Sequence, residues 1–320
     1  MLAAVVETFV EPPRYRDFAE PIAESGEVLV CVSHAAQSTL VKAQAAGKHY
    51  SVRAGLPFVA GADGVGRLED GTRVYFLFAR APFGSMAQIA PVRSEFCIWL
   101  PQDLDDATAA AAGNAGMSSW VALTERARFV RGESVLINGA TGVSGKLAVQ
   151  VAKYLGAKNV IATGRNPNVL ESLPALGADA VISLDTSAEK LIERLRREMR
   201  ERDVSVVLDY LWGPPAEHLI EAIAGPGAAQ TDAAVRFVQI GGSAGPTISL
   251  NAAALRSSKL ELVGSGLGSV SFQKLVGAIE LFFRAFVPAK FQIAIELTPL
   301  SDVDVAWNHD APERRRVFRL

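Results

Sequence analysis

The 320-residue sequence predicts an α/β protein in which a doubly wound parallel sheet is inserted into a β-rich domain. Three observations predict this fold. From about residue 118 to 265, short apolar strands alternate with helices, a pattern typical of a parallel sheet covered on both faces. The first of these strands runs into a glycine-rich turn that opens a helix. The segments on either side have strand composition, and the second is too short to build a core alone.

The first 115 residues carry the β-rich part. The N-terminus alternates apolar and polar residues, which predicts a strand, and turns are expected at Glu69–Gly71 and Pro82–Gly84. The other expected elements are strands at Val28–Val32, Arg73–Phe78 and Ser85–Ala90, and a helix at Thr39–Ala46.

The central part repeats a strand–helix unit. Strands are expected near 134–138, 159–163, 179–183, 204–209, 235–240 and 260–264, with helices such as 147–155 and 188–200 between them. The tail predicts a helix at Phe272–Phe286 and strands at Phe291–Leu297 and Arg316–Arg319. We therefore expect residues 118–265 to form a dinucleotide-binding domain, and residues 1–117 and 266–320 to form the substrate domain together.

The turn after the first central strand is the strongest functional signal. Three glycines, Gly139, Gly142 and Gly145, separate the strand from the helix in the pattern Ala140-x-Gly142-x-x-Gly145. Such a turn binds pyrophosphate through backbone amides and the positive end of the helix dipole. The alternative interpretation is that the glycine-rich turn only connects the strand to the helix. The residues expected to contact the cofactor are Ala140, Thr141, Gly142, Val143, Ser144, Gly145 and Lys146, although Lys146 could instead only decorate the first helical turn.

The end of the second central strand indicates which dinucleotide binds. An NAD site usually has an acidic residue there, whereas this chain has Gly164-Arg165-Asn166. A guanidinium can bind a 2′-phosphate, which a carboxylate would repel. We therefore expect NADPH, with Arg165 as the main determinant and Asn166 and Thr163 as possible helpers. The alternative is an arginine solvated on a loop.

The bulk composition fits a cytoplasmic enzyme. Apolar residues make up 49% and charged residues 21% of the chain, and the net charge of −2 suggests neither nucleic acid nor an anionic membrane as a partner. The sequence shows neither a leader-like N-terminus nor an apolar run of membrane-spanning length. Cys31 and Cys97 are expected to be buried free thiols.

The organisation and several motifs resemble the medium-chain dehydrogenase/reductase superfamily. The stretch 57–66, Pro-Phe-Val-Ala-Gly-Ala-Asp-Gly-Val-Gly, looks like the glycine-rich segment of its chaperonin-10-like (GroES-like) domain. Asp70–Val74 resembles the turn that follows, and Leu176–Ile182 resembles the entry to the third strand of its Rossmann domain. The resemblance covers essentially the whole chain. It implies a Rossmann doubly wound parallel sheet inserted in a GroES-like domain, and it points to the zinc-free quinone oxidoreductase-like group.

The residues also argue against a metal. Zinc-dependent members of this superfamily have a histidine in a Gly-His-Glu segment, whereas this chain has Gly61-Ala62-Asp63. Two cysteines cannot form a four-cysteine zinc site. The four histidines lack ligand spacing, and His34 is expected to be a partly buried, hydrogen-bonded side chain. We therefore expect no metal.

The absence of zinc restricts the expected chemistry to acceptors that are already electrophilic. The favoured function is a zinc-independent, NADPH-dependent reductase that transfers hydride to a quinone or an α,β-unsaturated carbonyl. One alternative is a zinc-free aldehyde or alcohol oxidoreductase. The other is a non-catalytic NADPH-binding sensor or interaction protein.

The resemblance implies where substrate contacts lie, though with less precision. The family commonly has a Gly-x-Tyr turn after the helix at Thr39–Ala46, and Tyr50 or the adjacent His49 could fill that role here. Packing of Tyr50 as a rim residue is the equal alternative. Ser38 stands where related reductases often have asparagine. Phe58 and Trp120 could form an aromatic wall or, as the safer interpretation, part of the core.

The nicotinamide end is expected at the later strands. Ser118 resembles a family threonine near the nicotinamide, with a helix N-cap as the alternative, in a segment expected to open the helix that enters the nucleotide domain. Glycine-rich turns after parallel strands add Gly241, Gly242, Ser243, Gly264, Ser265 and Gly266, for which turn formation is the competing explanation. Arg314–Arg316 could reach the 2′-phosphate, but a solvated charge run is favoured. Strand 260–264 is expected to pair between subunits of a homodimer.

Overall fold

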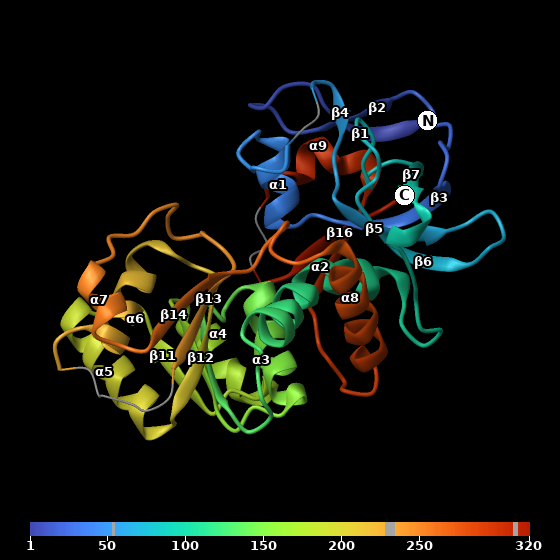
Figure 1. The fold of residues 1–320 in the computed structure, drawn as a ribbon. Coiled ribbons are helices and arrows are strands. Elements are labelled where there is room, and N and C mark those ends of the chain that lie inside the picture. Colours follow the sequence, from blue (N-terminus) through green and yellow to red (C-terminus); the bar gives the residue numbers. More distant parts are fainter. Residues whose placement is uncertain (53–54, 228–233, 310–312) are drawn as a thin grey trace. The chain divides into compact units, whose positions relative to one another are not determined.

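The computed structural model describes residues 1–52, 55–227, 234–309 and 313–320, which divide into two units (Figure 1). Unit 1 comprises Met1–Met117 and Gln273–Leu320, and unit 2 comprises Ser118–Phe272. Unit 1 is therefore built from two chain segments that flank unit 2. Among the described residues, none of the helices has both the length and the apolar character needed to cross a bilayer.

Unit 2 contains a parallel sheet with the strand order β11-β10-β9-β12-β13-β14, as the described residues define it. This confirms the doubly wound sheet. Its strands are β9 (Ser134–Asn138), β10 (Val160–Gly164), β11 (Ala180–Ser183), β12 (Val204–Asp209), β13 (Val235–Gln239) and β14 (Leu260–Gly264). The chain first extends the sheet on one side of β9 and then on the other, so the topological switch point lies between β9 and β12.

The central strands are buried along their whole length because helices cover the sheet. All positions of β9, β10 and β12 are buried, which explains their near-continuous apolar composition. The covering helices are α3 (Val143–Leu155), α4 (Pro167–Ser172), α5 (Ala188–Glu201), α6 (Gly213–Ala224) and α7 (Ala252–Arg256). On α5, Leu191 and Leu195 are one helical turn apart and pack in one apolar cluster with Phe237 of β13.

Unit 1 contains two mainly antiparallel sheets. The smaller has the order β2-β1-β4 and the larger β15-β16-β3-β5-β6-β8, with β7 also paired to β3. Their strands are β1 (Leu2–Val6), β2 (Arg14–Asp17), β3 (Glu27–Ala36), β4 (Phe58–Val59), β5 (Asp63–Arg67), β6 (Arg73–Leu77), β7 (Ile89–Arg93), β8 (Cys97–Trp99), β15 (Ile295–Pro299) and β16 (Arg315–Arg319). The C-terminal strand β16 pairs directly with β3, as expected for a tail that completes this unit.

Helices of unit 1 pack closely through glycines. They are α1 (Thr39–Ala45), the longer α2 (Asp106–Val121), which continues into unit 2, α8 (Phe272–Phe286) and the short α9 (Val303–Ala306). A Cβ at Gly116 of α2 would lie 2.0 Å from the ring of Phe282 on α8. The prediction that the Asn114–Trp120 segment opens a helix is wrong, because α2 begins at Asp106.

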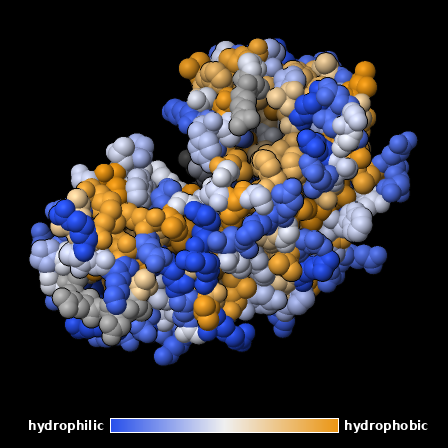
Figure 2. Space-filling model, in the orientation of Figure 1, coloured by the Kyte–Doolittle hydropathy of each residue, from blue (hydrophilic) through white to orange (hydrophobic). Residues whose placement is uncertain are grey.

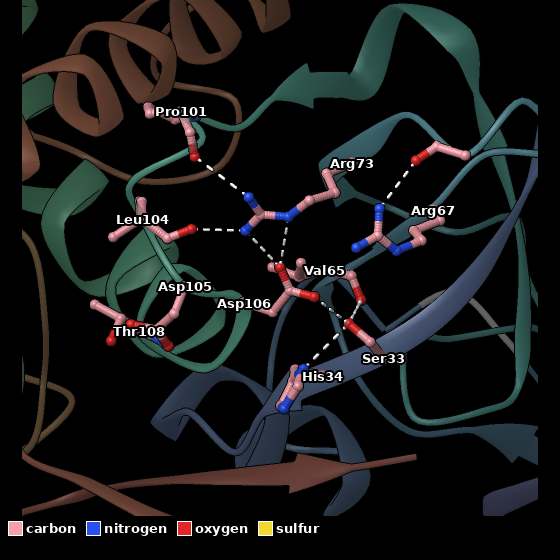
Figure 3. Close-up of polar contacts among 11 residues, drawn as sticks. Ser33, His34, Val65, Arg67, Arg73, Pro101, Leu104, Asp105, Asp106 and Thr108 are labelled. Carbon is pink, nitrogen blue, oxygen red and sulfur yellow. Dashed lines mark hydrogen bonds and ion pairs between the residues drawn. The ribbon is translucent and has the colours of Figure 1, made fainter.

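A polar cluster fixes the start of α2 to the larger sheet (Figure 3). The Arg73 guanidinium donates to Asp106 Oδ1 through Nε at 2.9 Å and Nη2 at 2.6 Å. Asp106 Oδ2 accepts from Ser33 Oγ at 3.1 Å, and the same hydroxyl lies 3.1 Å from His34 Nδ1. His34 is thus a half-buried, hydrogen-bonded side chain, and burial lowers its pKa.

Several strand boundaries differ from the prediction, and β3 extends to Ala36 where the strand was expected to end at Val32. The strand expected at Ser85–Ala90 is β7, which begins only at Ile89. The strand expected at Phe291–Leu297 is β15, which begins at Ile295, because Phe291 turns inward and its ring lies 5.8 Å from that of Phe282. Cys31 and Cys97 are free, but Cys31 is exposed on β3 and Cys97 is half-buried, so the expectation that both are buried is wrong.

The basic run near the C-terminus is not a solvated charge run, contrary to the prediction. Arg315 is 8% exposed and Arg316 is 6% exposed, whereas Arg314 is exposed. Arg315 donates to the carbonyl of Gln37, and Arg316 Nη2 donates to both carboxylate oxygens of Glu296, at 2.9 and 3.1 Å. These bonds give the buried guanidinium groups acceptors, although the Nε atom of each arginine has no partner among the described residues, and they hold β16 in place within unit 1.

Candidate functional site

The glycine-rich turn of unit 2 connects β9 to α3 at the switch point. Gly139 has φ of 92°, a conformation that favours glycine. The Ala140 N–H donates to the Thr163 carbonyl of β10 at 2.7 Å, which fixes the turn against the neighbouring strand. Gly142 is the N-cap of α3 and offers no capping side chain. The first amides of α3 therefore need an acceptor from outside the helix.

Two of the glycines serve different purposes. A Cβ at Gly145 would lie 2.3 Å from the Gly139 carbonyl oxygen, so glycine is required there by packing of the helix against the turn. A Cβ at Gly142 would meet nothing within 4 Å, and its φ of −81° suits any residue. Gly142 is also exposed. The protein itself therefore gives no reason for a glycine at 142, whereas a phosphate approaching the helix N-terminus does.

The remaining turn residues surround this position. Ala140 is buried, whereas Thr141, Val143, Ser144 and Lys146 are half-buried. Residues 139–142 form the turn between β9 and α3, and residues 143–146 are the first turn of the helix. The Lys146 N–H donates to the Gly142 carbonyl, so its backbone is already part of the helix.

The end of β10 lies beside the turn. A Cβ at Gly164 would lie 2.2 Å from Thr141 Cγ2, so these two predicted residues are brought together. Arg165 follows and is exposed, and the described part of the chain gives its side chain no hydrogen bond or ion pair. Asn166 caps α4, with its Oδ1 accepting from the Asn168 N–H at 3.1 Å. The interpretation of Thr163 as a helper at the 2′-phosphate is wrong, because its hydroxyl is buried and bonds to Asn138.

On the other side of the switch point, the loops after β12 and β13 and the end of β14 line an open cavity of about 350 Å³. Its lining consists of Trp212, Gln239, Gly242, Gly245, Pro246, Leu262, Val263 and Gly264. The predicted residues Gly242 and Gly264 thus meet around one cavity. Around α7, where Leu255 is 45% exposed, hydrophobic surface gathers on this unit (Figure 2).

The other predicted residues of these loops shape the turns and do not line the cavity. The Gly241 N–H donates to the Asp209 carbonyl, and Ser243 Oγ donates to the Tyr210 carbonyl at 3.1 Å. The Ser265 N–H donates to the Gln239 carbonyl, and the Gly266 N–H donates to Ser269 Oγ at 2.9 Å.

Sequence reasoning missed two buried residues at the switch point. Asn138 is the last residue of β9, and Asp209 is the last residue of β12. The Asn138 Nδ2 atom donates a 2.8 Å hydrogen bond to Asp209 Oδ1. Burial raises the pKa of Asp209 to about 6, although its hydrogen bonds from Asn138, Leu211 and Trp212 favour the charged form. A polar residue at the carboxyl end of an otherwise apolar strand was the available signal, because ligands of open α/β sheets bind at that edge.

Ser118 lies within α2, and its Oγ is 3.2 Å from the Tyr210 hydroxyl. The alternative interpretation of Ser118 as a helix N-cap is wrong, because α2 begins twelve residues earlier. Burial raises the pKa of Tyr210 to about 12. This pair places a hydroxyl cluster beside the loop that follows β12.

In unit 1, the turn after α1 holds both candidate catalytic residues. Tyr50 is 71% exposed, and its ring contacts that of His49 in a tilted arrangement, with centroids 4.2 Å apart. His49 Nδ1 accepts from the Ser51 N–H at 3.2 Å and lies 2.7 Å from Ser51 Oγ, which in turn accepts from Gln44 Nε2 at 3.0 Å. A backbone N–H can only donate, so Nδ1 is a lone-pair acceptor and neutral His49 carries its proton on Nε2. Burial lowers the pKa of His49, which favours this neutral form.

Three further residues have structural roles. Ser38 is buried and caps α1, accepting from the Val41 N–H at 3.2 Å. Phe58 of unit 1 is 8% exposed and Trp120 of unit 2 is 5% exposed, so each packs in its own core, as the safer interpretation held.

The described residues contain no group of three or more His, Cys, Asp or Glu side chains placed to hold a metal ion. At the position where the family's zinc proteins have their Gly-His-Glu segment, Asp63 is buried and accepts from the Tyr75 hydroxyl at 2.8 Å.

Several known proteins are similar to this chain. A family model described as zinc-binding dehydrogenase matches residues 144–284. The chain is 28% identical over 232 residues to the probable NADPH-dependent quinone reductase tdiC of Emericella nidulans, covering 68% of this chain and 62% of that protein. It is 30% identical over 180 residues to the 2-methylene-furan-3-one reductase of Solanum lycopersicum, covering 51% of this chain and 46% of that one.

The chain spans only 7% of the length of the phthioceranic/hydroxyphthioceranic acid synthase of Mycobacterium tuberculosis, to which it is 32% identical over 161 residues. Among solved structures, the quinone oxidoreductase of Thermus thermophilus, described alone and in complex with NADPH, superposes with a TM-score of 0.82. That match covers 100% of both chains at 25% identity.

Proposed function

The chain belongs to the medium-chain dehydrogenase/reductase superfamily, and from this premise we propose that it is an NADPH-dependent, zinc-independent reductase of a quinone or an α,β-unsaturated carbonyl. The observation that carries the proposal is the pairing of an open helix N-terminus at Gly142 with a basic residue, Arg165, in the place where NAD sites have an acid.

The residues of unit 2 fit the cofactor. The amides at the start of α3 would bind the pyrophosphate, and the space beside Gly142 would admit it. The exposed guanidinium of Arg165 would bind the 2′-phosphate with two charge-assisted hydrogen bonds. At the other side of the switch point, the cavity lined by Trp212, Gly242 and Gly264 offers an aromatic ring and open backbone for the nicotinamide half.

NADPH supplies a hydride when it is bound, and the substrate must then accept both that hydride and a proton. A quinone or a conjugated carbonyl is electrophilic without a Lewis acid, so the chain needs only to orient it and to stabilise negative charge on its oxygen. We assign the second task to the turn after α1, where His49 presents an Nε2–H donor and Tyr50 an exposed phenol. The relatives named as quinone reductase and furanone reductase support this substrate class.

Independence from zinc is supported by the residues at the family's metal position. Ala62 stands where a histidine ligand would be required, and Asp63 is turned into the core toward Tyr75. We further propose a homodimer. In unit 2, β14 is an outer strand of the parallel sheet within the described residues, so its outer edge can pair with the same strand of a second copy.

The test is a comparison of NADPH and NADH oxidation with a 1,4-quinone, an unsaturated aldehyde, a saturated aldehyde and no acceptor. We expect turnover with NADPH on the first two substrates only. Replacing Arg165 by Ala should weaken NADPH binding by roughly tenfold or more, as expected for loss of a charge-assisted hydrogen bond, and leave NADH binding unchanged. Arg197→Ala, which removes an exposed arginine from α5 of the same unit, is the matched control.

Other outcomes separate the alternatives. Turnover of the saturated aldehyde at a similar rate would favour an aldehyde reductase. Binding of NADPH without turnover of any acceptor would favour a non-catalytic NADPH-binding protein. An equal preference for NADH, or no change in Arg165→Ala, would contradict the assignment of the 2′-phosphate site. Light scattering of the purified protein tests the dimer, which a monomeric mass would exclude.

A further inference from the structure

A chain of buried hydrogen bonds joins the carboxyl ends of three neighbouring strands in unit 2. The Gly139 N–H of the glycine turn donates to Thr163 Oγ1 at 3.2 Å, and the Thr163 hydroxyl donates to Asn138 Oδ1 at 2.7 Å. The Asn138 amide then donates to Asp209 Oδ1 at 2.8 Å. Asn138 and Asp209 are the last residues of β9 and β12, Thr163 is the residue before the last in β10, and all three are 0% exposed.

Asp209 extends this chain into the loops around the cavity. Its Oδ1 also accepts from the Leu211 N–H and its Oδ2 from the Trp212 N–H, each at 3.1 Å. Its backbone carbonyl accepts from the N–H groups of Ile240 and Gly241, at 2.8 and 3.1 Å. Both loops that follow β12 and β13 are therefore attached to one residue.

The backbone of these loops needs such support. Trp212 has φ of 55°, in a region that non-glycine residues rarely adopt and that persists only when its surroundings fix it. A Cβ at Gly139 would lie 2.8 Å from the Leu211 side chain, so the glycine turn and the loop after β12 are in direct contact. A change in the geometry of the glycine turn would therefore alter the geometry of the loop after β12, and the reverse.

The location of the network is informative. The rest of β9 and β12 near this end is apolar, with Val135, Leu136, Val207 and Leu208 buried, and apolar side chains would fill the same space without the need for matched partners. The connected network of Thr163, Asn138 and Asp209 lies at the edge where the dinucleotide is proposed to bind. Fully satisfied buried networks specify a single geometry, which an apolar core does not.

We propose that Thr163, Asn138 and Asp209 are positioning residues that hold the glycine turn and the two cavity loops in one arrangement, so that the two halves of NADPH are bound together. This inference rests on the proposed NADPH-dependent function. Thr163 orients the turn that faces the pyrophosphate, Asp209 orients the loops that face the nicotinamide half, and Asn138 connects them.

The experiment uses calorimetric titration of the full chain with three probes. These are NADPH, 2′,5′-ADP as the adenosine half, and nicotinamide mononucleotide as the other half. The variants are Thr163→Val, which keeps the shape of the side chain and removes its hydroxyl, Asp209→Asn, and the double variant. Thr163→Ser retains the hydroxyl and serves as the conservative rescue.

The matched control is Ser134→Ala. Ser134 lies at the opposite end of β9, is 2% exposed and accepts from Asn159 Nδ2 at 3.1 Å. Its replacement removes a buried hydrogen bond from the same strand, away from the candidate site. It therefore reports what loss of stability alone does to binding, and thermal midpoints are recorded for every variant.

We expect Thr163→Val to weaken 2′,5′-ADP binding and Asp209→Asn to weaken mononucleotide binding, each by about fivefold to a hundredfold, as expected when buried hydrogen-bonding groups lose partners. For NADPH, the two changes should be non-additive by roughly threefold or more, since both act on one network. Thr163→Ser should bind like the wild type, and Ser134→Ala should lose thermal stability but not affinity.

Two results would overturn the inference, and a third concerns its premise. Variants that melt at lower temperature but bind all three probes like the wild type would show that the network is structural only. Additive effects on NADPH would show that the two ends act independently. Wild-type protein that binds none of the probes would instead contradict the proposed function, and the inference would fall with it.

Discussion

The Tyr75 hydroxyl donates a 2.8 Å hydrogen bond to Asp63 Oδ2 in the interior of unit 1. Tyr75 is 0% and Asp63 is 1% exposed, and Asp63 Oδ1 has no hydrogen-bond partner. Burial raises the pKa of Asp63 to about 6, with the hydrogen bond from Tyr75 and the charge of Arg315 opposing the shift. The carboxyl group is therefore more easily protonated in the folded chain than in the unfolded chain.

The stability of the protein should depend on this group between about pH 4 and pH 6. As the pH rises through this window, the unfolded state loses the Asp63 proton first, so the free energy of unfolding falls, by up to about 3 kcal/mol for a shift of this size. Asp63→Asn cannot titrate and keeps an oxygen for Tyr75. We expect urea unfolding, followed by circular dichroism at several pH values, to show a shallower decline in this variant.

The control for that measurement is Asp103→Asn, at an exposed aspartate of the same unit. It should show the same pH dependence as the wild type. If the free energy of unfolding of Asp63→Asn declined with pH as steeply as that of the control, the raised pKa of Asp63 would be refuted.

The two glycines of the cofactor turn should respond to alanine in opposite ways. Gly142→Ala places a methyl group in open space, so the free energy of unfolding should change by less than about 1 kcal/mol while NADPH affinity falls. Gly145→Ala forces a methyl group to 2.3 Å from the Gly139 carbonyl, which should cost about 1–3 kcal/mol or more. Thermal melts and NADPH titrations measure both quantities. Unchanged affinity in a stable Gly142→Ala protein would argue against phosphate binding at this turn.

Helix packing in unit 1 gives a second pair of opposite effects. Gly116→Ala on α2 would press a methyl group against the Phe282 ring at 2.0 Å and should destabilise the protein by about 1–3 kcal/mol. Gly277→Ala on α8 meets nothing within 4 Å and should stabilise it by about 0.5–1 kcal/mol, because alanine is the better helix former. Chemical denaturation of both variants checks the signs, and stabilisation by Gly116→Ala would show that the α2–α8 contact is looser than described.

The hydrogen bonds of His49 predict its tautomer. Because Nδ1 accepts from the Ser51 N–H and lies 2.7 Å from Ser51 Oγ, the neutral ring should carry its proton on Nε2. Nitrogen-15 NMR at about pH 7.5, where a histidine of lowered pKa is neutral, should give Nδ1 the chemical shift of an unprotonated ring nitrogen, with His49→Gln used to assign the signals. Ser51→Ala should reduce the population of this tautomer. A protonated Nδ1 in the wild type would remove the proposed Nε2 donor.

The sequence predicted the parallel sheet well because each central strand is a short apolar run that ends in a turn. Errors arose where distant contacts override local composition. Phe291 has strand-like neighbours, but packing against Phe282 and Phe286 delays the start of β15. Arg315 and Arg316 form part of a charge run by composition, and their burial is explained by contacts with residues distant in sequence, such as Gln37 and Glu296.

In the candidate site, too, local features were predicted and contacts between distant residues were not. The turn from Gly139 to Gly145 is contiguous in sequence, so its spacing predicted both the turn and the helix that follows. Asn138 and Asp209 are 71 residues apart, and no local pattern pairs them. Their partnership follows from the register of β9 and β12, which a single sequence does not encode in any short motif.

The division of unit 1 into two chain segments bears on how the polypeptide is completed during synthesis. Unit 2 has all the described strands of its parallel sheet once residue 264 has been made. In unit 1, β3 is made early, by residue 36, yet one of its neighbours, β16, ends at residue 319. During synthesis, the described strands of the unit 2 sheet are therefore complete before β16 is made, and the edge of β3 that pairs with β16 stays open until residues 315–319 follow.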